Sequence, residues 1–165
     1  MKVILMGNAG SGKSTLAQLL TAEKPAARLS LDEVAFQPGT AARRPLDQSI
    51  EDVRHFIEAN DDWIIEGCYA DIIDAILNQC DTLIFLNPGT DTCVAHCRTR
   101  PWEPTKFASK LEQDANLENL IAWVRDYETR TDEYGLHRHK TLFDSFGGTK
   151  LELKEPSAYA TAALQ

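Results

Sequence analysis

An eight-residue glycine-rich segment near the N-terminus constrains the fold of this chain more than any other feature. Its sequence is Gly7-Asn8-Ala9-Gly10-Ser11-Gly12-Lys13-Ser14. The spacing of its glycines, lysine and hydroxyl residue matches a phosphate-binding loop, in which small residues let backbone N–H groups point at an anion. The apolar run 2–6 before it predicts a buried strand. Residues 14–20 after it predict a helix, whose positive N-terminal end would face the phosphates.

The predicted roles within this loop follow from its chemistry. The ammonium group of Lys13 reaches the β- and γ-phosphates of a nucleoside triphosphate, and the hydroxyl group of Ser14 ligates Mg²⁺. The motif lies between a predicted strand and a predicted helix, as this function requires. We therefore predict ATP and Mg²⁺ as cofactors, with nucleotide contacts from Gly7, Asn8, Ala9, Gly10, Ser11, Gly12, Lys13, Ser14 and Thr15.

Strand-like and helix-like segments alternate along the rest of the chain. Further strands are predicted at residues 28–31, 63–65, 82–86 and 150–153, and helices at 46–58, 71–77, 92–98, 111–133, from 135 to 143 and at 157–164. This alternation predicts a single α/β domain over residues 1–165, a three-layer sandwich with a five-stranded parallel sheet covered by helices on both faces. Ligands of such folds bind at the carboxyl ends of the strands.

Composition excludes some classes of partner. The net charge of −8 argues against nucleic acid, and no segment has the roughly 20 apolar residues of a membrane span. The N-terminal residues lack signal-peptide features, so we expect a cytoplasmic protein with reduced cysteines. Cys93, His96 and Cys97 share a helix face, but their spacing fits no standard zinc motif, and buried cysteines explain it as well.

The phosphate-binding loop alone does not distinguish a kinase from a GTPase or another hydrolase. A guanine-specific protein needs an Asn-Lys-x-Asp motif well beyond an Asp-x-x-Gly motif. The segments 144–147 and 149–152 are near-matches that lie only a turn apart, and we interpret both as chance. The chain is also too short for the large insertions of motor and transport ATPases.

Two further blocks of sequence resemble a known family. One is Leu31-Asp32-Glu33-Val34-Ala35-Phe36-Gln37-Pro38-Gly39, and the other is Trp63-Ile64-Ile65-Glu66-Gly67-Cys68-Tyr69. Together with the loop, they resemble the small P-loop kinases of the adenylate kinase and shikimate kinase group. The nearest branch is that of adenylate-kinase-related proteins called DNA topology modulation proteins. The resemblance covers nearly the whole chain and implies a kinase scaffold with a short lid.

The resemblance implies an acceptor site near the second and third strands, in a segment of about 33–62. Asp32 takes the place of an acid that lies near the acceptor, where it orients or deprotonates a hydroxyl group or holds Mg²⁺ through water. Glu66 takes the place of an acid that holds Mg²⁺ through its water shell. The other residues that we predict to contact the acceptor are Arg43, Arg44, Gly67 and Tyr69.

The resemblance also implies a lid at about residues 99–108. Arg98 directly precedes this lid and Arg100 lies within it, and Arg130 lies in an Arg-x-x-x-Tyr pattern that follows the lid of shikimate kinases. Guanidinium groups over the site stabilise the charge of a transferred phosphoryl group. We predict Lys13, Asp32, Arg100 and Arg130 as catalytic and Arg98 as a nucleotide contact, with Arg125 as a second candidate. His137 and His139 are predicted to be surface residues or to support the lid.

The sequence thus predicts ATP- and Mg²⁺-dependent transfer of a phosphoryl group to a small anionic or hydroxylated acceptor. The acceptor itself stays open, because no base pocket is recognisable. Shikimate kinases carry Gly-Gly-Gly where this chain has Gly67-Cys68-Tyr69. Two alternatives remain: a nucleotide-binding regulatory protein, and a weak NTPase without an acceptor.

Overall fold

A five-stranded, all-parallel sheet forms the centre of the chain. The computed structural model describes residues 1–163, and the strand order in the sheet is β2-β3-β1-β4-β5. The strands are β1 (Lys2–Gly7), β2 (Ala27–Ser30), β3 (Trp63–Gly67), β4 (Thr82–Leu86) and β5 (Thr149–Leu153). Every neighbouring pair is parallel, so the predicted fold class is confirmed.

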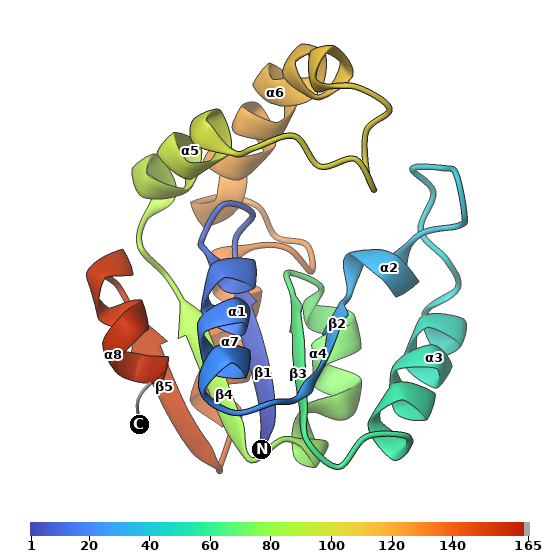
Figure 1. The fold of residues 1–165 in the computed structure, drawn as a ribbon, viewed down its shortest axis with the longest axis vertical. Coiled ribbons are helices and arrows are strands. Elements are labelled where there is room, and N and C mark those ends of the chain that lie inside the picture. The colour runs from blue at the N-terminus through green and yellow to red at the C-terminus, as the bar shows by residue number, and fades with distance from the viewer. Residues whose placement is uncertain (164–165) are drawn as a thin grey trace.

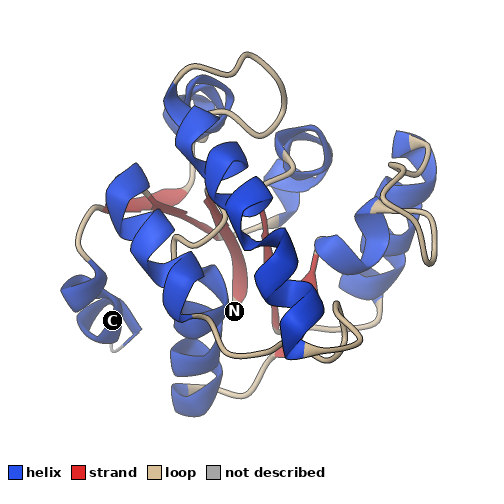
Figure 2. Cartoon of the chain, turned by 90° about the horizontal axis from the view of Figure 1, so that it is seen from above, coloured by secondary structure: helices blue, strands red, loops and turns tan. Residues whose placement is uncertain are grey.

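Helices cover both faces of the sheet and its upper edge (Figures 1 and 2). One face carries α1 (Lys13–Glu23) and α8 (Tyr159–Ala163), and the other carries α3 (Leu46–Glu58), α4 (Ala70–Ile76) and α7 (Leu136–Ser145). Above the carboxyl ends of the strands lie α5 (Thr90–Thr99) and α6 (Lys110–Arg125), which pack against each other. The short helix α2 (Asp32–Ala35) follows β2, and single 3₁₀ turns occupy Leu77–Gln79, Asp126–Glu128 and Pro156–Ala158.

Alternation of side chains along β1 divides the core into two layers. Val3 and Leu5 pack with residues of α1 and α8, whereas Ile4 and Met6 pack with residues of α4 and α7. Successive side chains of a strand point to opposite faces, so a strand that is covered on both faces must be apolar throughout. This explains why the short run 2–6 was recognisable as a strand. A third cluster, which includes Cys93 and Val124, joins α5 to α6.

Two predicted segments differ from the structure. The helix predicted over 111–133 ends at Arg125, because Thr129 and Asp132 bond to nearby backbone instead of continuing the helix. The Thr129 hydroxyl group donates to the Asp126 carbonyl group, and Asp132 accepts from the Tyr134 N–H group. The last residue of the predicted terminal helix, Leu164, lies outside the described residues. None of the helices within residues 1–163 combines the length and apolarity needed to cross a membrane.

Candidate active site

The glycine-rich loop joins the end of β1 to the first residue of α1, and only glycine fits two of its positions. Gly10 and Gly12 adopt left-handed backbone conformations, with φ of 77° and 96°. A Cβ atom on Gly10 would lie 2.4 Å from the Cys93 carbonyl oxygen, and one on Gly12 would lie 2.7 Å from the Tyr159 ring. The loop is therefore shaped by close contacts with α5 and α8.

Side chains of two helices and a backbone carbonyl group of a third hold this loop. His96 of α5 hydrogen-bonds the Gly10 carbonyl oxygen at 2.7 Å, and the Tyr159 hydroxyl group of α8 donates to the Ser11 carbonyl oxygen at 2.5 Å. Asn8 donates to the Val124 carbonyl oxygen of α6 at 3.1 Å. The N–H groups of Gly10, Gly12 and Lys13 form no hydrogen bond to any residue in the described part of the chain. This arrangement leaves donors for an anion at the N-terminus of α1.

Lys13 and Ser14 extend the polar surface of the loop. The ammonium group of Lys13 donates to the carbonyl oxygens of Gly7 and Asn8 at 3.1 and 2.7 Å. The hydroxyl group of Ser14 donates to the two carboxylate oxygens of Glu66 at 2.8 and 3.0 Å. Glu66 is buried at the end of β3, next to β1, so the structure brings together these two oxygen-bearing side chains, which the sequence predicts as metal ligands.

Asp32 begins α2, just beyond the end of β2. Its Oδ1 accepts a hydrogen bond of 2.6 Å from the Tyr69 hydroxyl group, and its Oδ2 lies 3.0 Å from the ammonium group of Lys106. Burial opposes ionisation of this carboxyl group, but the charge of Lys106 and the hydrogen bond from Tyr69 outweigh it. The pKa of Asp32 therefore lies below its ordinary value of 3.8, and the group is a carboxylate at neutral pH.

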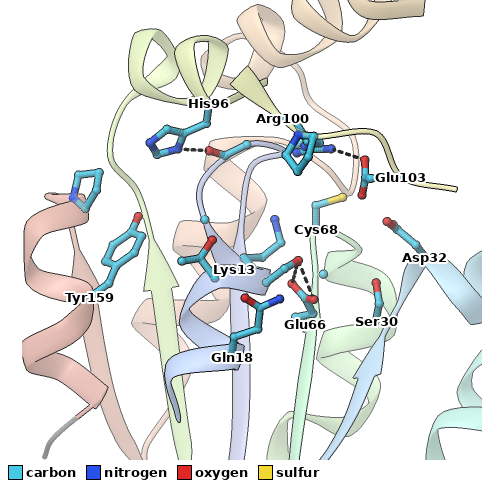
Figure 3. A pocket seen from close by; sticks show the side chains of 18 of the residues that line it. Lys13, Gln18, Ser30, Asp32, Glu66, Cys68, His96, Arg100, Glu103 and Tyr159 are labelled. Carbon is cyan, nitrogen blue, oxygen red and sulfur yellow. Dashed lines mark hydrogen bonds and ion pairs between the residues drawn. The ribbon is translucent and has the colours of Figure 1, made fainter. Parts of the chain in front are cut away.

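These groups line one large cavity and a smaller one that adjoins it. The larger cavity, of about 690 Å³, contains the loop, Lys13, Ser14, Glu66, Gly67 and Asp32 (Figure 3). The smaller, of about 260 Å³, lies between the body of the domain and α6. The two cavities share Ala9, Asp32, Cys68, Arg100, Glu103 and Lys106. Asp32 thus lies where the larger cavity, which contains the glycine-rich loop, meets the smaller cavity.

Three residues that line these cavities were not among the predicted site residues. Lys106 and Glu103 lie in the irregular segment between α5 and α6, and the Lys106 ammonium group also lies 3.3 Å from the Glu103 carboxylate. His96 contacts the loop from α5. Lys106 falls within the predicted lid, so a charge count of that segment would have found it. His96 has no comparable signal, since its partner is a backbone carbonyl group far away in the sequence.

Two predicted arginines of the α5 region have different positions. Arg100 lines both cavities, and its guanidinium group lies 3.3 Å from the carboxylate of Glu103. Arg98 lines neither; it is half-exposed and pairs with Glu118 of α6 at 3.1 Å. Arg125, the second candidate, is exposed and lies 3.9 Å from Asp91. The structure therefore brings only Arg100 of these three to the cavity.

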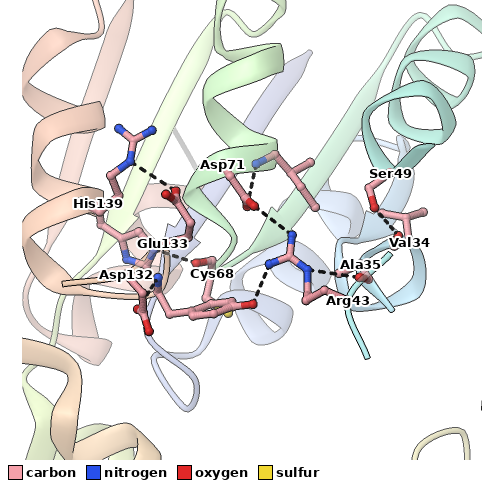
Figure 4. A network of polar contacts seen from close by, with 12 residues as sticks. Val34, Ala35, Arg43, Ser49, Cys68, Asp71, Asp132, Glu133 and His139 are labelled. Carbon is pink, nitrogen blue, oxygen red and sulfur yellow. Dashed lines mark hydrogen bonds and ion pairs between the residues drawn. The ribbon is translucent and has the colours of Figure 1, made fainter. Parts of the chain in front are cut away.

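The predicted acceptor arginines, Arg43 and Arg44, are committed to partners within the protein. Arg43 donates to the Ala35 carbonyl oxygen at 3.2 Å, to the Tyr134 hydroxyl group at 2.6 Å and to Asp71 at 3.0 Å (Figure 4). Arg44 pairs with Asp52 at 2.6 Å. Neither lines either of the two cavities, which leaves Gly67 on the larger one and Tyr69 on the smaller one.

Arg130 is likewise held by other side chains. It donates to both carboxylate oxygens of Asp132 at 2.8 Å, and its guanidinium carbon lies 4.3 Å from the centre of the Trp123 ring. It lines neither cavity, although Trp123 lines the smaller one. The contact with Trp123 is a cation–π interaction, so Arg130 fixes one wall of the smaller cavity.

His139 is completely buried, so the prediction of a surface position is wrong. Its Nδ1 bonds the Tyr127 hydroxyl group at 2.7 Å and its Nε2 bonds the Cys68 carbonyl oxygen at 2.9 Å. The Cys68 carbonyl group accepts, so Nε2 carries the proton and Nδ1 accepts from Tyr127. The ring thereby fixes the backbone between Gly67 and Tyr69. On α7 it lies on the same helix face as Leu136 and Leu142, three residues away on either side, and this period was a signal of burial that the prediction missed.

We expect His139 to make the protein less stable as the pH falls. Burial lowers the pKa of His139 from 6.5 to about 4. Between these two pH values the unfolded chain binds a proton at this residue and the folded chain does not. The free energy of unfolding should fall by about 1.4 kcal/mol for each pH unit between 6.5 and 4. Urea unfolding at several pH values measures this slope. It should flatten in His139→Asn and persist in His137→Asn, because His137 is exposed; equal slopes in both variants would contradict the assignment.

Comparison with known proteins gives a structural match and no sequence match. No protein-family model and no curated protein sequence matches the chain. Among solved structures, a sugar kinase from Janibacter sp. HTCC2649, determined without ligand, superposes with a TM-score of 0.55 and 14% sequence identity. The match covers 98% of this chain and 91% of that protein. The shared property is the fold, an α/β architecture that extends over nearly the whole chain.

Proposed function

We propose that this chain is an ATP- and Mg²⁺-dependent kinase that phosphorylates a hydroxyl group of a small acceptor. One observation supports this most strongly: Lys13 of the phosphate-binding loop and Asp32 of α2 line the same cavity, and Asp32 also opens onto a second compartment. A donor site and an acceptor site that share a carboxylate suit phosphoryl transfer. The similarity in fold to a sugar kinase supports the same class of reaction.

In this proposal the residues act mainly by position and charge. Backbone N–H groups of the loop and the ammonium group of Lys13 bind the β- and γ-phosphates. Asp32 accepts the proton of the acceptor hydroxyl group as its oxygen forms a bond to the γ-phosphorus atom. The bond from that phosphorus to the β–γ bridging oxygen breaks, and ADP leaves. Arg100 and Lys106, in the lid at about 99–108, balance the charge on the transferred group.

Ser14 and Glu66 fit a magnesium site. One hydroxyl group and one carboxylate are in direct contact on the wall of the cavity, and Mg²⁺ characteristically takes few protein ligands, with phosphates and water supplying the others. The residues described by the structure include no group of three or more His, Cys, Asp or Glu side chains that could hold a metal alone. Bound Mg²⁺ would neutralise phosphate charge and make the γ-phosphoryl group more electrophilic.

Replacing Glu66 by glutamine tests this site. The variant keeps a hydrogen-bond acceptor for Ser14 but loses the negative charge, so the Mg²⁺ concentration for half-maximal binding of an ATP analogue should rise by about 10–100-fold. Titration of Mg²⁺ against a fluorescent analogue measures the shift. Glu118→Gln is the matched control, because Glu118 is exposed, pairs with Arg98 and lines neither cavity. An unchanged midpoint in Glu66→Gln would remove Glu66 from the site.

A weak NTPase or a nucleotide-binding regulator remains the second candidate. It is favoured by the commitment of Arg43, Arg44 and Arg130 to carboxylates within the protein, which leaves fewer free cations than a kinase site could use. The two functions differ in acceptor dependence. We expect ADP formation from ATP and Mg²⁺ to rise on addition of the correct member of a chemically broad acceptor panel. Phosphate release at the same slow rate with every compound would instead identify the hydrolase, and no turnover would identify the regulator.

A further inference from the structure

We infer that the acceptor is an uncharged, hydroxylated compound with a flat aromatic body, of the size and chemistry of a nucleoside. This inference rests on the proposed kinase function and specifies the compartment next to Asp32. It narrows the sequence-based expectation, which left an anionic or a hydroxylated acceptor open. Three properties of the smaller cavity lead to it: an apolar wall, the internal commitment of the nearby arginines, and the balance of charge at the junction.

The apolar wall consists of side chains from the segment before α6 and from α6 itself. Phe107, Leu117, Leu120 and Trp123 line the smaller cavity opposite Tyr69. Its volume of about 260 Å³ lies just below the roughly 300–1,000 Å³ of typical small-molecule sites, so it suits a compact ligand. Apolar and aromatic walls of this kind bind flat rings by stacking and by exclusion of water.

Two arginines stabilise the aromatic side chains of this compartment. The guanidinium carbon of Arg130 lies 4.3 Å from the Trp123 ring centre, and that of Arg43 lies 5.1 Å from the Tyr69 ring centre. Tyr134 bridges the two, with ring centres 5.5 Å from both Tyr69 and Trp123. The two guanidinium groups thus hold the aromatic rings in place. Neither arginine lines the smaller cavity, so neither is available there to bind an acidic ligand.

The cations that do line the smaller cavity, Arg100 and Lys106, are matched by acids. Arg100 lies 3.3 Å from Glu103, and Lys106 contacts both Asp32 and Glu103. Two positive and two negative groups leave no net charge for a phosphorylated acceptor, whose transfer from water needs paired cations. A neutral hydroxyl group needs only an acceptor for its proton, and the Asp32 carboxylate provides one where the two cavities meet.

Three probes that differ by one feature each test this inference. Uridine has the flat body and hydroxyl groups, uridine monophosphate adds a charge, and ribose lacks the aromatic body. Adenosine and adenosine monophosphate, with the same ribose, repeat the comparison. Binding is measured by ligand-detected NMR in saturating Mg²⁺ and a non-hydrolysable ATP analogue, which occupies the donor site. We expect a nucleoside to bind at least ~10-fold more tightly than its monophosphate and than ribose. Tighter binding of the monophosphate or of ribose, or no binding by any probe, would overturn the inference.

Variants of the apolar wall connect binding to this compartment. Trp123→Ala should weaken nucleoside binding by about 10–100-fold and leave the affinity for the ATP analogue unchanged. Leu120→Ala, a smaller change on the same helix, should weaken it less and serves if Trp123→Ala does not fold. Leu111→Ala, on the exposed face of α6, is the control. Nucleoside binding that survives the first two variants would overturn the inference.

Turnover measurements separate this inference from the kinase proposal on which it rests. Phosphorylation of ribose or of a monophosphate would overturn the inference and leave the kinase proposal standing. Turnover that no acceptor stimulates would contradict the kinase proposal itself.

Discussion

Replacing Asp32 by asparagine is expected to lower kcat by about 10²–10⁴-fold, because the variant loses the group that accepts the acceptor's proton. Asparagine has nearly the same size and still accepts the hydrogen bond from Tyr69, so the local structure should persist. The affinity for an ATP analogue should change little, since Asp32 lies across the cavity from Lys13 and the glycine-rich loop (Figure 3). A coupled assay of ADP formation at saturating acceptor measures kcat directly.

The control for this experiment is Asp52→Asn. Asp52 also pairs with a cation, Arg44, but it lies on α3 and lines neither cavity, so its replacement should leave kcat unchanged. The pKa of Asp32 lies below 3.8 because Lys106 and Tyr69 outweigh the effect of burial. The group is therefore ionised throughout the neutral range, and its protonation should not limit the rate there. Equal rates for Asp32→Asn and the wild-type protein would exclude Asp32 as the base.

The fold was largely predictable because its signals are local. β1, β3 and β4 are apolar on both faces, and each ends at a glycine or an asparagine-proline turn that marks the carboxyl edge of the sheet. The helix at Leu46–Glu58 was predicted with its observed bounds from a regular apolar period. The error at 126–133 has a different origin. There Asp and Thr side chains compete with the helix for backbone hydrogen bonds, and such competition is decided by tertiary contacts.

The part of the candidate site formed by the glycine-rich loop could be predicted from the sequence for the same reason. Eight consecutive residues carry the loop, and the strand–helix context could be checked in the neighbouring sequence. Ser14 and Glu66 lie 52 residues apart, and they meet because β1 and β3 are parallel neighbours that end at the same edge of the sheet. The sequence analysis assigned Glu66 to Mg²⁺ through the resemblance to small P-loop kinases, because the strand pattern predicted a parallel sheet but not the order of its strands.

The arginines show the limit of reading charges from sequence. Arg43 and Arg130 lie in segments where a cation could face an anionic ligand. Arg43 instead contacts Asp71, 28 residues away, and Tyr134, 91 residues away. Arg130 contacts Asp132, two residues away. No local sequence pattern predicts whether an arginine side chain contacts solvent, a carboxylate or an aromatic ring. The sequence left an anionic or a hydroxylated acceptor open, and the internal partners of these arginines are one reason why we propose the neutral, hydroxylated one.

Replacing Lys13 by alanine is expected to lower kcat by about 10²–10³-fold, the effect of removing one charged donor from a transferring phosphoryl group. An ATP analogue that raises the melting temperature of the wild-type protein should also stabilise this variant far less, because stabilisation follows affinity. Both measurements are needed, because Lys13 also donates to the carbonyl oxygens of Gly7 and Asn8 and so shapes the loop.

Two further variants separate the charge of Lys13 from its structural role. Lys13→Gln keeps a donor for the loop carbonyl groups but carries no charge, so it should fold like the wild-type protein and still lose turnover. Lys140→Ala removes an exposed lysine of α7 that pairs with Asp144, and it should change neither turnover nor the thermal shift. If Lys13→Gln kept the wild-type kcat, the ammonium group would have no role in the reaction. The donor site would then have to be sought elsewhere than at the N-terminus of α1, and the role of Asp32 beside it would have to be reconsidered.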